Sequence, residues 1–316
     1  MTDPTTTATT TTTTTTHAPA PVLSAQPVVL PAPGRGTDLR VRVSAPATGA
    51  ELPVIVLSHG HGSSLHGYGP LADHWAAHGF VVLQPTHLDS RTLALPADDP
   101  RTPRIWRFRV EDLVRVLDGL DVLEAAVPGL AGRVDHDRIA VAGHSWGAQS
   151  AGMLLGARVL DADGAPGDDL SDPRVCAGVL FAAAGLGDDL SPFAREHLPF
   201  MRPSFATMTT PALIVAGDRD HSALSTRGPD WFTDAHTHSP GTTSLLTLSG
   251  AEHSLGGISG YEAAETTDES PARVALVQRL STAFLHSALR PGDTGWKAAA
   301  TALEADPEPL GTLRTP

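Results

Sequence analysis

Short uninterrupted runs of apolar residues recur along the chain and alternate with segments of helical periodicity. The clearest runs lie at residues 53–57, 80–84, 138–142, 175–181, 212–216 and 244–248. Runs of this length are typical of strands that are buried on both faces of a sheet. The alternation of such strands with helices therefore predicts an α/β fold, with a mostly parallel central sheet and helices on both of its faces.

Helical periodicity marks four of the intervening segments. They lie at residues 67–77, 104–123, 147–159 and 271–289. In the second segment, apolar residues recur at three- and four-residue spacing, which is the period of one helix face. Near the start of the chain, two short β-rich runs at residues 28–30 and 39–43 flank Gly34 and Gly36, and this pattern predicts an antiparallel hairpin.

The remaining segments set the expected domain organisation. Residues 1–25 are rich in Thr and Pro and bury little apolar surface, so we expect a disordered tail. We expect one catalytic domain over residues 26–290 and a loosely packed tail over residues 291–316. Within the domain, residues 185–210 are expected to form a short lid, and residues 89–103 a second loop that borders the site.

Composition narrows the possible partners. The chain of 316 residues is 41% apolar and carries a net charge of −13, which argues against a nucleic-acid partner. Cys176 is the only cysteine, so an intrachain disulfide and a cysteine-based zinc site are excluded. We expect no membrane span, because no apolar stretch is long enough, and a cytoplasmic location, because the N-terminus lacks the pattern of a signal peptide.

The first chemical signal is the pentapeptide Gly143-His144-Ser145-Trp146-Gly147. It lies between a predicted strand and a predicted helix of small residues, which is the context of a nucleophile elbow. In such an elbow a tight turn presents the serine hydroxyl above the sheet edge, and the glycines allow close backbone approach. We therefore predict that Ser145 is a nucleophile, against the alternative of a chance tight turn.

A serine nucleophile requires a base and an acid, which follow it in the order acid, then histidine. His253 comes after the last predicted strand, where the base is expected. Asp218 and Asp220 both come just after the strand before it. We predict Asp220 as the acid, because its offset clears the strand end, and keep Asp218 as the alternative.

The oxyanion hole requires two backbone N–H donors. The residue after the nucleophile, Trp146, is predicted to supply one, and His61 in the glycine-rich loop after residues 53–57 is predicted to supply the other. A competing interpretation treats His59 and His61 as a metal-ligand pair. It is disfavoured because no third ligand appears at a metal-site spacing.

Three further candidates carry a structural and a functional interpretation. Cys176 lies in a strand pattern and is interpreted as a small core residue in preference to a nucleophile. Arg104, Arg107 and Arg109 are interpreted as a solvated helix start in preference to a site for a substrate carboxylate. Trp146 either lines an acyl pocket or packs beside the elbow, and the sequence favours neither.

Four motifs together resemble a known family: VLSHGHGSS, DRIAVAGHSWGA, ALIVAGDRD and SGAEHSLGG. Over roughly residues 27–289 the chain is similar to the dienelactone-hydrolase group of the α/β-hydrolase superfamily, which also resembles chlorophyllases and platelet-activating-factor acetylhydrolases. The resemblance implies esterase chemistry. Ser145 departs from the cysteine nucleophile of typical dienelactone hydrolases. The acetylhydrolases carry their acid after the strand matched by residues 175–181, where this chain reads FAAAG, and this difference favours Asp220.

These observations lead to one functional hypothesis. We expect a serine hydrolase that cleaves a small-molecule carboxylic ester through Ser145, Asp220 and His253, with no cofactor or metal. A thioesterase, acyltransferase or peptidase with the same triad is the first alternative, because the fold does not determine the acyl acceptor. A non-catalytic binding protein on this fold is the second. The sequence leaves the substrate and the oligomeric state open.

Overall fold

A nine-stranded sheet forms the centre of the protein. The computed structural model describes residues 19–96, 98–260, 263–264 and 266–316. The strands lie in the order β1-β2-β4-β3-β5-β7-β9-β10-β11. Their bounds are β1 (Val22–Leu30), β2 (Leu39–Pro46), β3 (Leu52–Ser58), β4 (Val81–Pro85), β5 (Val134–His144), β7 (Val175–Phe181), β9 (Ala212–Gly217), β10 (Thr243–Leu248) and β11 (Gly311–Arg314).

The six central strands are parallel, and only the outer pairings are antiparallel. Strands β4, β3, β5, β7, β9 and β10 pair in parallel with their neighbours, whereas β1–β2, β2–β4 and β10–β11 are antiparallel. The carboxyl ends of the parallel strands therefore meet at one edge of the sheet, where ligand sites of open α/β sheets lie.

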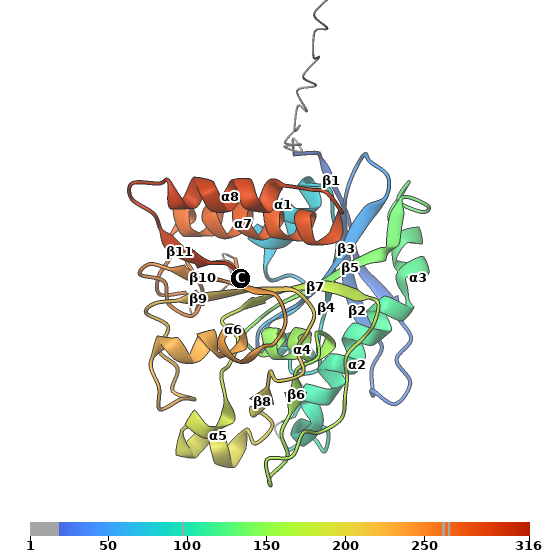
Figure 1. The fold of residues 1–316 in the computed structure, drawn as a ribbon. Coiled ribbons are helices and arrows are strands. Elements are labelled where there is room, and N and C mark those ends of the chain that lie inside the picture. Colours follow the sequence, from blue (N-terminus) through green and yellow to red (C-terminus); the bar gives the residue numbers. More distant parts are fainter. Residues whose placement is uncertain (1–18, 97, 261–262, 265) are drawn as a thin grey trace, which may run out of the picture.

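Helices cover both faces of this sheet (Figure 1). One face carries α1 (Gly69–Ala77), α7 (Pro271–Leu289) and α8 (Gly295–Glu304); the other carries α2 (Ile105–Asp118), α3 (Leu120–Ala125), α4 (Trp146–Leu154) and α6 (Asp234–His238). Along β3 the side chains alternate between the two cores. Val54 and Val56 pack with α2 and α4, while Ile55 and Leu57 pack with α1 and α7. The predicted α/β-hydrolase architecture is confirmed.

Two predicted helices are shorter than expected. The helix expected over residues 104–123 is divided at Gly119, where an added Cβ would lie 2.9 Å from the side chain of Leu30. The helix expected to reach residue 159 ends at Leu154, and Gly156 follows with a φ of 106°. Arg158–Val159 then form β6, which pairs with β8 (Pro203–Ser204).

Both ends of the expected catalytic domain differ from the prediction. Strand β1 begins at Val22, four residues before the expected boundary, and residues 1–18 of the expected disordered tail lie outside the described residues. The expected loose tail from residue 291 instead forms α8 and β11. Leu303 of α8 is buried in the core, and β11 pairs with β10, so this segment gains both apolar burial and sheet hydrogen bonds.

The expected lid over residues 185–210 is a short excursion between β7 and β9. It contains a 3-10 helix (Gly187–Asp189), α5 (Pro192–His197) and β8. Arg227, in the loop after β9, holds the excursion in place through ion pairs of 3.0 Å to Asp189 and 3.0 Å to Asp234. Within the described ranges, no helix has the length and apolar character needed to cross a membrane.

Candidate active site

Ser145 occupies a sharp turn between a central strand and a helix. Strand β5 ends at His144 and α4 begins at Trp146, and Ser145 between them has a φ of 55° and a ψ of −119°. The flanking glycines allow the turn, because an added Cβ would lie 2.1 Å from the Gly147 oxygen at Gly143 and 2.0 Å from the Ser58 oxygen at Gly147. This strained strand–turn–helix geometry is that of a nucleophile elbow.

An acid and a histidine meet at the ends of the neighbouring strands. Asp220 follows β9 and His253 follows β10, and His253 Nδ1 lies 2.9 Å from Asp220 Oδ2. The Asp220 side chain is 1% exposed, whereas the His253 side chain is 44% exposed. Donation from Nδ1 to the buried carboxylate leaves Nε2 of His253 to accept a proton.

Asp218 has a different partner. Its Oδ1 atom accepts a hydrogen bond of 2.6 Å from the backbone N–H of Gly250, and the residue is exposed. Asp218 therefore fixes the turn that follows β10, three residues before His253, and Asp220 is the member of the pair that contacts the imidazole.

The elbow and the histidine are held side by side. His144, the residue before Ser145, donates from Nε2 to the His253 carbonyl oxygen across 2.8 Å, and their ring centroids lie 4.9 Å apart. Within the described part of the chain, Ser145 Oγ makes no hydrogen bond. Hydrogen bonds between a nucleophile and its base are often long without substrate and shorten in the reacting complex.

The backbone N–H groups of His61 and Trp146, beside the elbow, have no protein partner among the described residues. The Trp146 group lies at the start of α4, at the positive end of the helix dipole. The His61 and Trp146 rings lie 4.3 Å apart, so the two segments adjoin. Both groups are available as donors to a developing negative charge.

Both ring nitrogens of His59 form hydrogen bonds within the protein, so neither is available to bind a metal ion together with His61. The Nε2 atom of His59 accepts from the backbone N–H of His87 at 3.0 Å, and its Nδ1 atom donates to the Gly60 oxygen at 2.7 Å. Burial lowers the pKa of His59 well below its usual value, so the ring stays neutral. Because both nitrogens are engaged, the geometry argues against the metal-pair interpretation.

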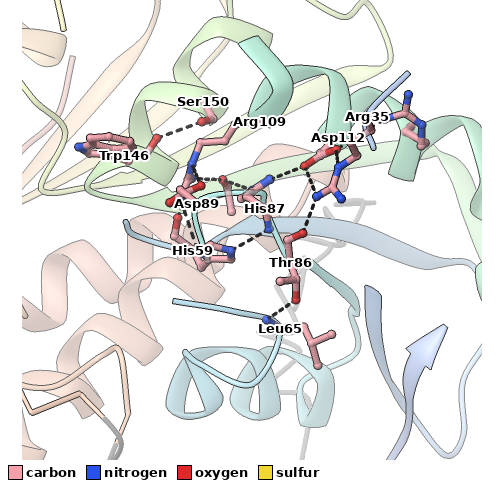
Figure 2. A network of polar contacts seen from close by, with 12 residues as sticks. Arg35, His59, Leu65, Thr86, His87, Asp89, Arg109, Asp112, Trp146 and Ser150 are labelled. Atoms are coloured by element: carbon pink, nitrogen blue, oxygen red, sulfur yellow. Dashed lines mark hydrogen bonds and ion pairs between the residues drawn. The ribbon is translucent and has the colours of Figure 1, made fainter. Parts of the chain in front are cut away.

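The interpretation of the three arginines is correct for two of them and wrong for the third. Arg104 is exposed, and Arg107 pairs at the surface with Asp168 at 2.8 Å. Arg109 is 1% exposed and forms two bonds of 2.9 Å to Asp89 (Figure 2). The helical periodicity indicates this burial, because Arg109 lies four residues after Ile105 and therefore on the same, buried face of α2.

The polar network of Arg109 and Asp89 continues through His59 to His87, Asp112 and Arg35 (Figure 2). Ser58 Oγ lies 2.9 Å from His87 Nε2, and His87 Nδ1 lies 3.0 Å from Asp112 Oδ2, which also pairs with Arg35. These are the residue types of a catalytic triad, yet the side chains of His87 and Asp112 are fully buried. With no access to substrate, this set joins the loop after β1 to α2.

Cys176 is exposed, which corrects its assignment to the core. It lies near the amino end of β7, away from the carboxyl edge, and its Sγ atom contacts the carbonyl oxygens of Asp137 at 3.6 Å and Arg174 at 3.5 Å. Its neighbour Val175 takes the buried position in the strand.

Comparison with known proteins supports the fold and the class of chemistry. The model of the chlorophyllase family matches residues 25–159, which is less than half of the chain. The matched region includes the His59–Gly62 loop, Arg109 and Ser145, and ends before Asp220 and His253. No curated protein matches the chain. Together with the sheet, the family match indicates an ester hydrolase of the α/β-hydrolase type.

Proposed function

From an α/β-hydrolase fold whose first half matches the chlorophyllase family, we propose that this protein is a serine hydrolase of carboxylic esters. The observation that carries the proposal is the 2.9 Å bond between His253 and buried Asp220, beside the elbow that holds Ser145. A serine hydroxyl is a weak nucleophile alone, and this arrangement supplies the base that activates it.

The proposed reaction begins with attack of Ser145 Oγ on the ester carbonyl carbon. His253 Nε2 takes the hydroxyl proton, and Asp220 stabilises the imidazolium and holds the ring in the required tautomer. The carbonyl oxygen becomes an oxyanion, which the N–H groups of His61 and Trp146 stabilise. His253 then returns the proton to the leaving alcohol oxygen, and the acyl group remains on Ser145.

Deacylation uses the same residues in reverse roles. Water loses a proton to His253 as it attacks the acyl carbon. The second tetrahedral species then collapses, its bond to Ser145 Oγ breaks, and His253 returns the proton to Oγ as the acid leaves. No step requires a metal or an organic cofactor. We expect a small-molecule ester as the substrate and keep the cytoplasmic location as a prediction.

The test uses purified full-length protein and its Ser145→Ala variant. The wild type should hydrolyse activated esters and react stoichiometrically with a fluorophosphonate at Ser145, identified by peptide mass spectrometry. The variant should lose both activities while its thermal unfolding is preserved, because the hydroxyl lies at a partly exposed turn. A residual rate about 10³–10⁴-fold over water is compatible with the mechanism. Turnover near the wild-type level in Ser145→Ala would exclude it.

A further inference from the structure

The loop His59–Gly62 contacts one buried ion pair, formed by Arg109 and Asp89. Arg109 Nη1 donates to the His59 oxygen at 2.8 Å, and Arg109 Nη2 approaches the Gly60 oxygen at 3.3 Å. Asp89 Oδ2 accepts from the Gly62 N–H at 3.1 Å and lies 3.3 Å from His61 Nδ1. The pair thus contacts four consecutive residues of the loop. Figure 2 shows Arg109 and Asp89 beside His59.

The contact with Gly60 determines where the His61 N–H points. A peptide unit is planar and trans, so the Gly60 oxygen and the His61 N–H point in opposite directions. The Gly60 oxygen accepts from His59 Nδ1 at 2.7 Å, from the Ser63 N–H at 3.2 Å and from Arg109 Nη2 at 3.3 Å, which directs it toward the buried pair. The His61 N–H is consequently directed away from the buried pair, and it has no partner among the described residues.

The neighbouring peptides prevent this unit from rotating. The peptide between His59 and Gly60 is bonded at both ends, with its oxygen on Arg109 and its N–H donating to Tyr68 Oη at 3.0 Å. The following peptide donates its Gly62 N–H to Asp89. These bonds hold the two peptides on either side, and a flip of the Gly60–His61 peptide itself would break the bonds of the Gly60 oxygen to His59 Nδ1 and Arg109, so its orientation is set before any substrate binds.

The burial of this pair suggests a role beyond stability. The side chains of Arg109 and Asp89 are 1% and 5% exposed. Burial raises the pKa of the Asp89 carboxyl, but the Arg109 charge together with the hydrogen bonds from His61 and Arg109 outweighs burial and holds that pKa well below its usual range. A buried ion pair adds little net stability compared with apolar packing. Its value here lies in five fixed N–H donors aimed at two carbonyls and a carboxylate.

We propose that Asp89 and Arg109 are positioning residues that preset the His61 N–H as an oxyanion donor. The proposal rests on the proposed esterase function. Arg109 also lies 6.0 Å from the ring of Trp146, whose backbone N–H is the second proposed donor. One guanidinium thus lies next to both segments of the proposed oxyanion hole, and the side chains of both residues of the pair are buried.

The test compares Arg109→Lys and Asp89→Asn with the matched control Arg107→Lys, which replaces a partly exposed arginine of the same helix. Lysine keeps the charge of Arg109 and loses the planar set of donors. We expect kcat to fall about 100-fold in each test variant with KM changed less than about threefold, because the lost contact acts on the transition state. The control should match the wild type.

A second measurement separates positioning from simple destabilisation. A boronic acid binds the activated serine as a tetrahedral adduct that occupies the oxyanion hole. Across the folded variants its affinity should fall by the same factor as kcat/KM, because such an analogue resembles the transition state. The asparagine variant keeps the size of Asp89 and provides the measurement if Arg109→Lys does not fold.

Several outcomes would overturn the proposal. One is a folded Arg109→Lys protein with kcat within about twofold of the wild type; another is a loss of kcat/KM with unchanged boronate affinity. Failure of the esterase function itself would show separately, as wild-type protein with no hydrolysis that depends on Ser145.

Discussion

His144 Nε2 donates a hydrogen bond of 2.8 Å to the carbonyl oxygen of His253, which joins the elbow to the loop of the proposed base. Because a carbonyl only accepts, Nε2 carries the proton and Nδ1 must accept, here from Tyr68 Oη at 2.7 Å. Tyr68 Oη in turn accepts from the Gly60 N–H. Burial lowers the pKa of His144 to about 3, so this ring stays neutral and keeps the direction of both bonds.

Replacing His144 should therefore affect catalysis through two loops at once. We expect His144→Phe, which keeps a ring and loses both bonds, to lower kcat about 10–100-fold in a folded protein, since small misplacements of reacting groups cost this much. Tyr68→Phe keeps the His253 contact and should cost less. Steady-state kinetics with one activated ester measures kcat for both variants. If both had the kcat of the wild type, the predicted role of His144 would be wrong.

The acid can be identified by two conservative variants. Asp220→Asn should lower kcat by several orders of magnitude, because the amide favours the wrong tautomer of His253; the comparable change in a serine protease costs about 10⁴-fold. Asp218→Asn should cost far less, since Asp218 bonds the Gly250 N–H and not the ring. A dead Asp218→Asn with an active Asp220→Asn would reverse the assignment. If both stay active, the acid lies elsewhere, with Asp188 and Asp189 the next candidates.

Trp146 is expected to limit the size of the acyl group. Its ring centroid lies 4.3 Å from that of His61 and 5.3 Å from that of Phe200. Phe200 lies in the segment between β7 and β9, and its carbonyl oxygen accepts a hydrogen bond of 2.8 Å from Gln149. Trp146→Ala should raise kcat/KM for longer acyl chains relative to acetate by about tenfold, the scale of one methylene in a pocket. An unchanged ratio across an ester panel would show that Trp146 only packs beside the elbow.

The buried imidazoles predict a loss of stability in acid. Burial lowers the pKa values of His59, His87 and His144, so below about pH 6.5 the unfolded chain binds protons that the folded chain does not. Each imidazole then costs about 1.4 kcal/mol of unfolding free energy per pH unit. Burial raises the pKa of Asp112 to about 6, so below that pH the folded state binds a proton at Asp112 that the unfolded state does not. This uptake offsets the destabilising effect of one of the three imidazoles.

Urea unfolding between pH 7.5 and pH 4.5 measures this dependence. Stability should be constant above about pH 7 and fall steadily below it. His144→Phe removes one titrating imidazole, so its curve should be shallower than that of the wild type. Parallel curves for the two proteins would contradict the role of His144 in this slope.

Apolar pattern was sufficient to predict the parallel part of the sheet. Runs such as residues 53–57 are buried on both faces, so hydrophobicity alone marks them. Strand β11 was missed because its sequence, GTLR, has little apolar character and gains its order from pairing with β10. The strand propensity of a short segment does not include the contribution of a partner strand that is distant in the sequence.

In the candidate site, too, some features could be predicted from the sequence and others depend on residues that are distant in the chain. Ser145, Asp220 and His253 follow strand ends, so their proximity could be predicted from chain order. Arg109 was misread because a charged side chain is normally solvated, and its burial depends on Asp89, which lies 20 residues earlier, and on backbone carbonyls. Neither the ion pair nor the His144 contact has a local signature.

Strand β11 also determines how the sheet ends. It covers the free side of β10, an apolar strand of sequence TSLLTL that leads into the His253 loop. Without it, β10 would present a row of unpaired N–H and C=O groups, a template on which second copies of the chain can pair. A chain shortened at residue 305 would therefore be expected to self-associate at this border, and an affinity tag is better placed at the N-terminus.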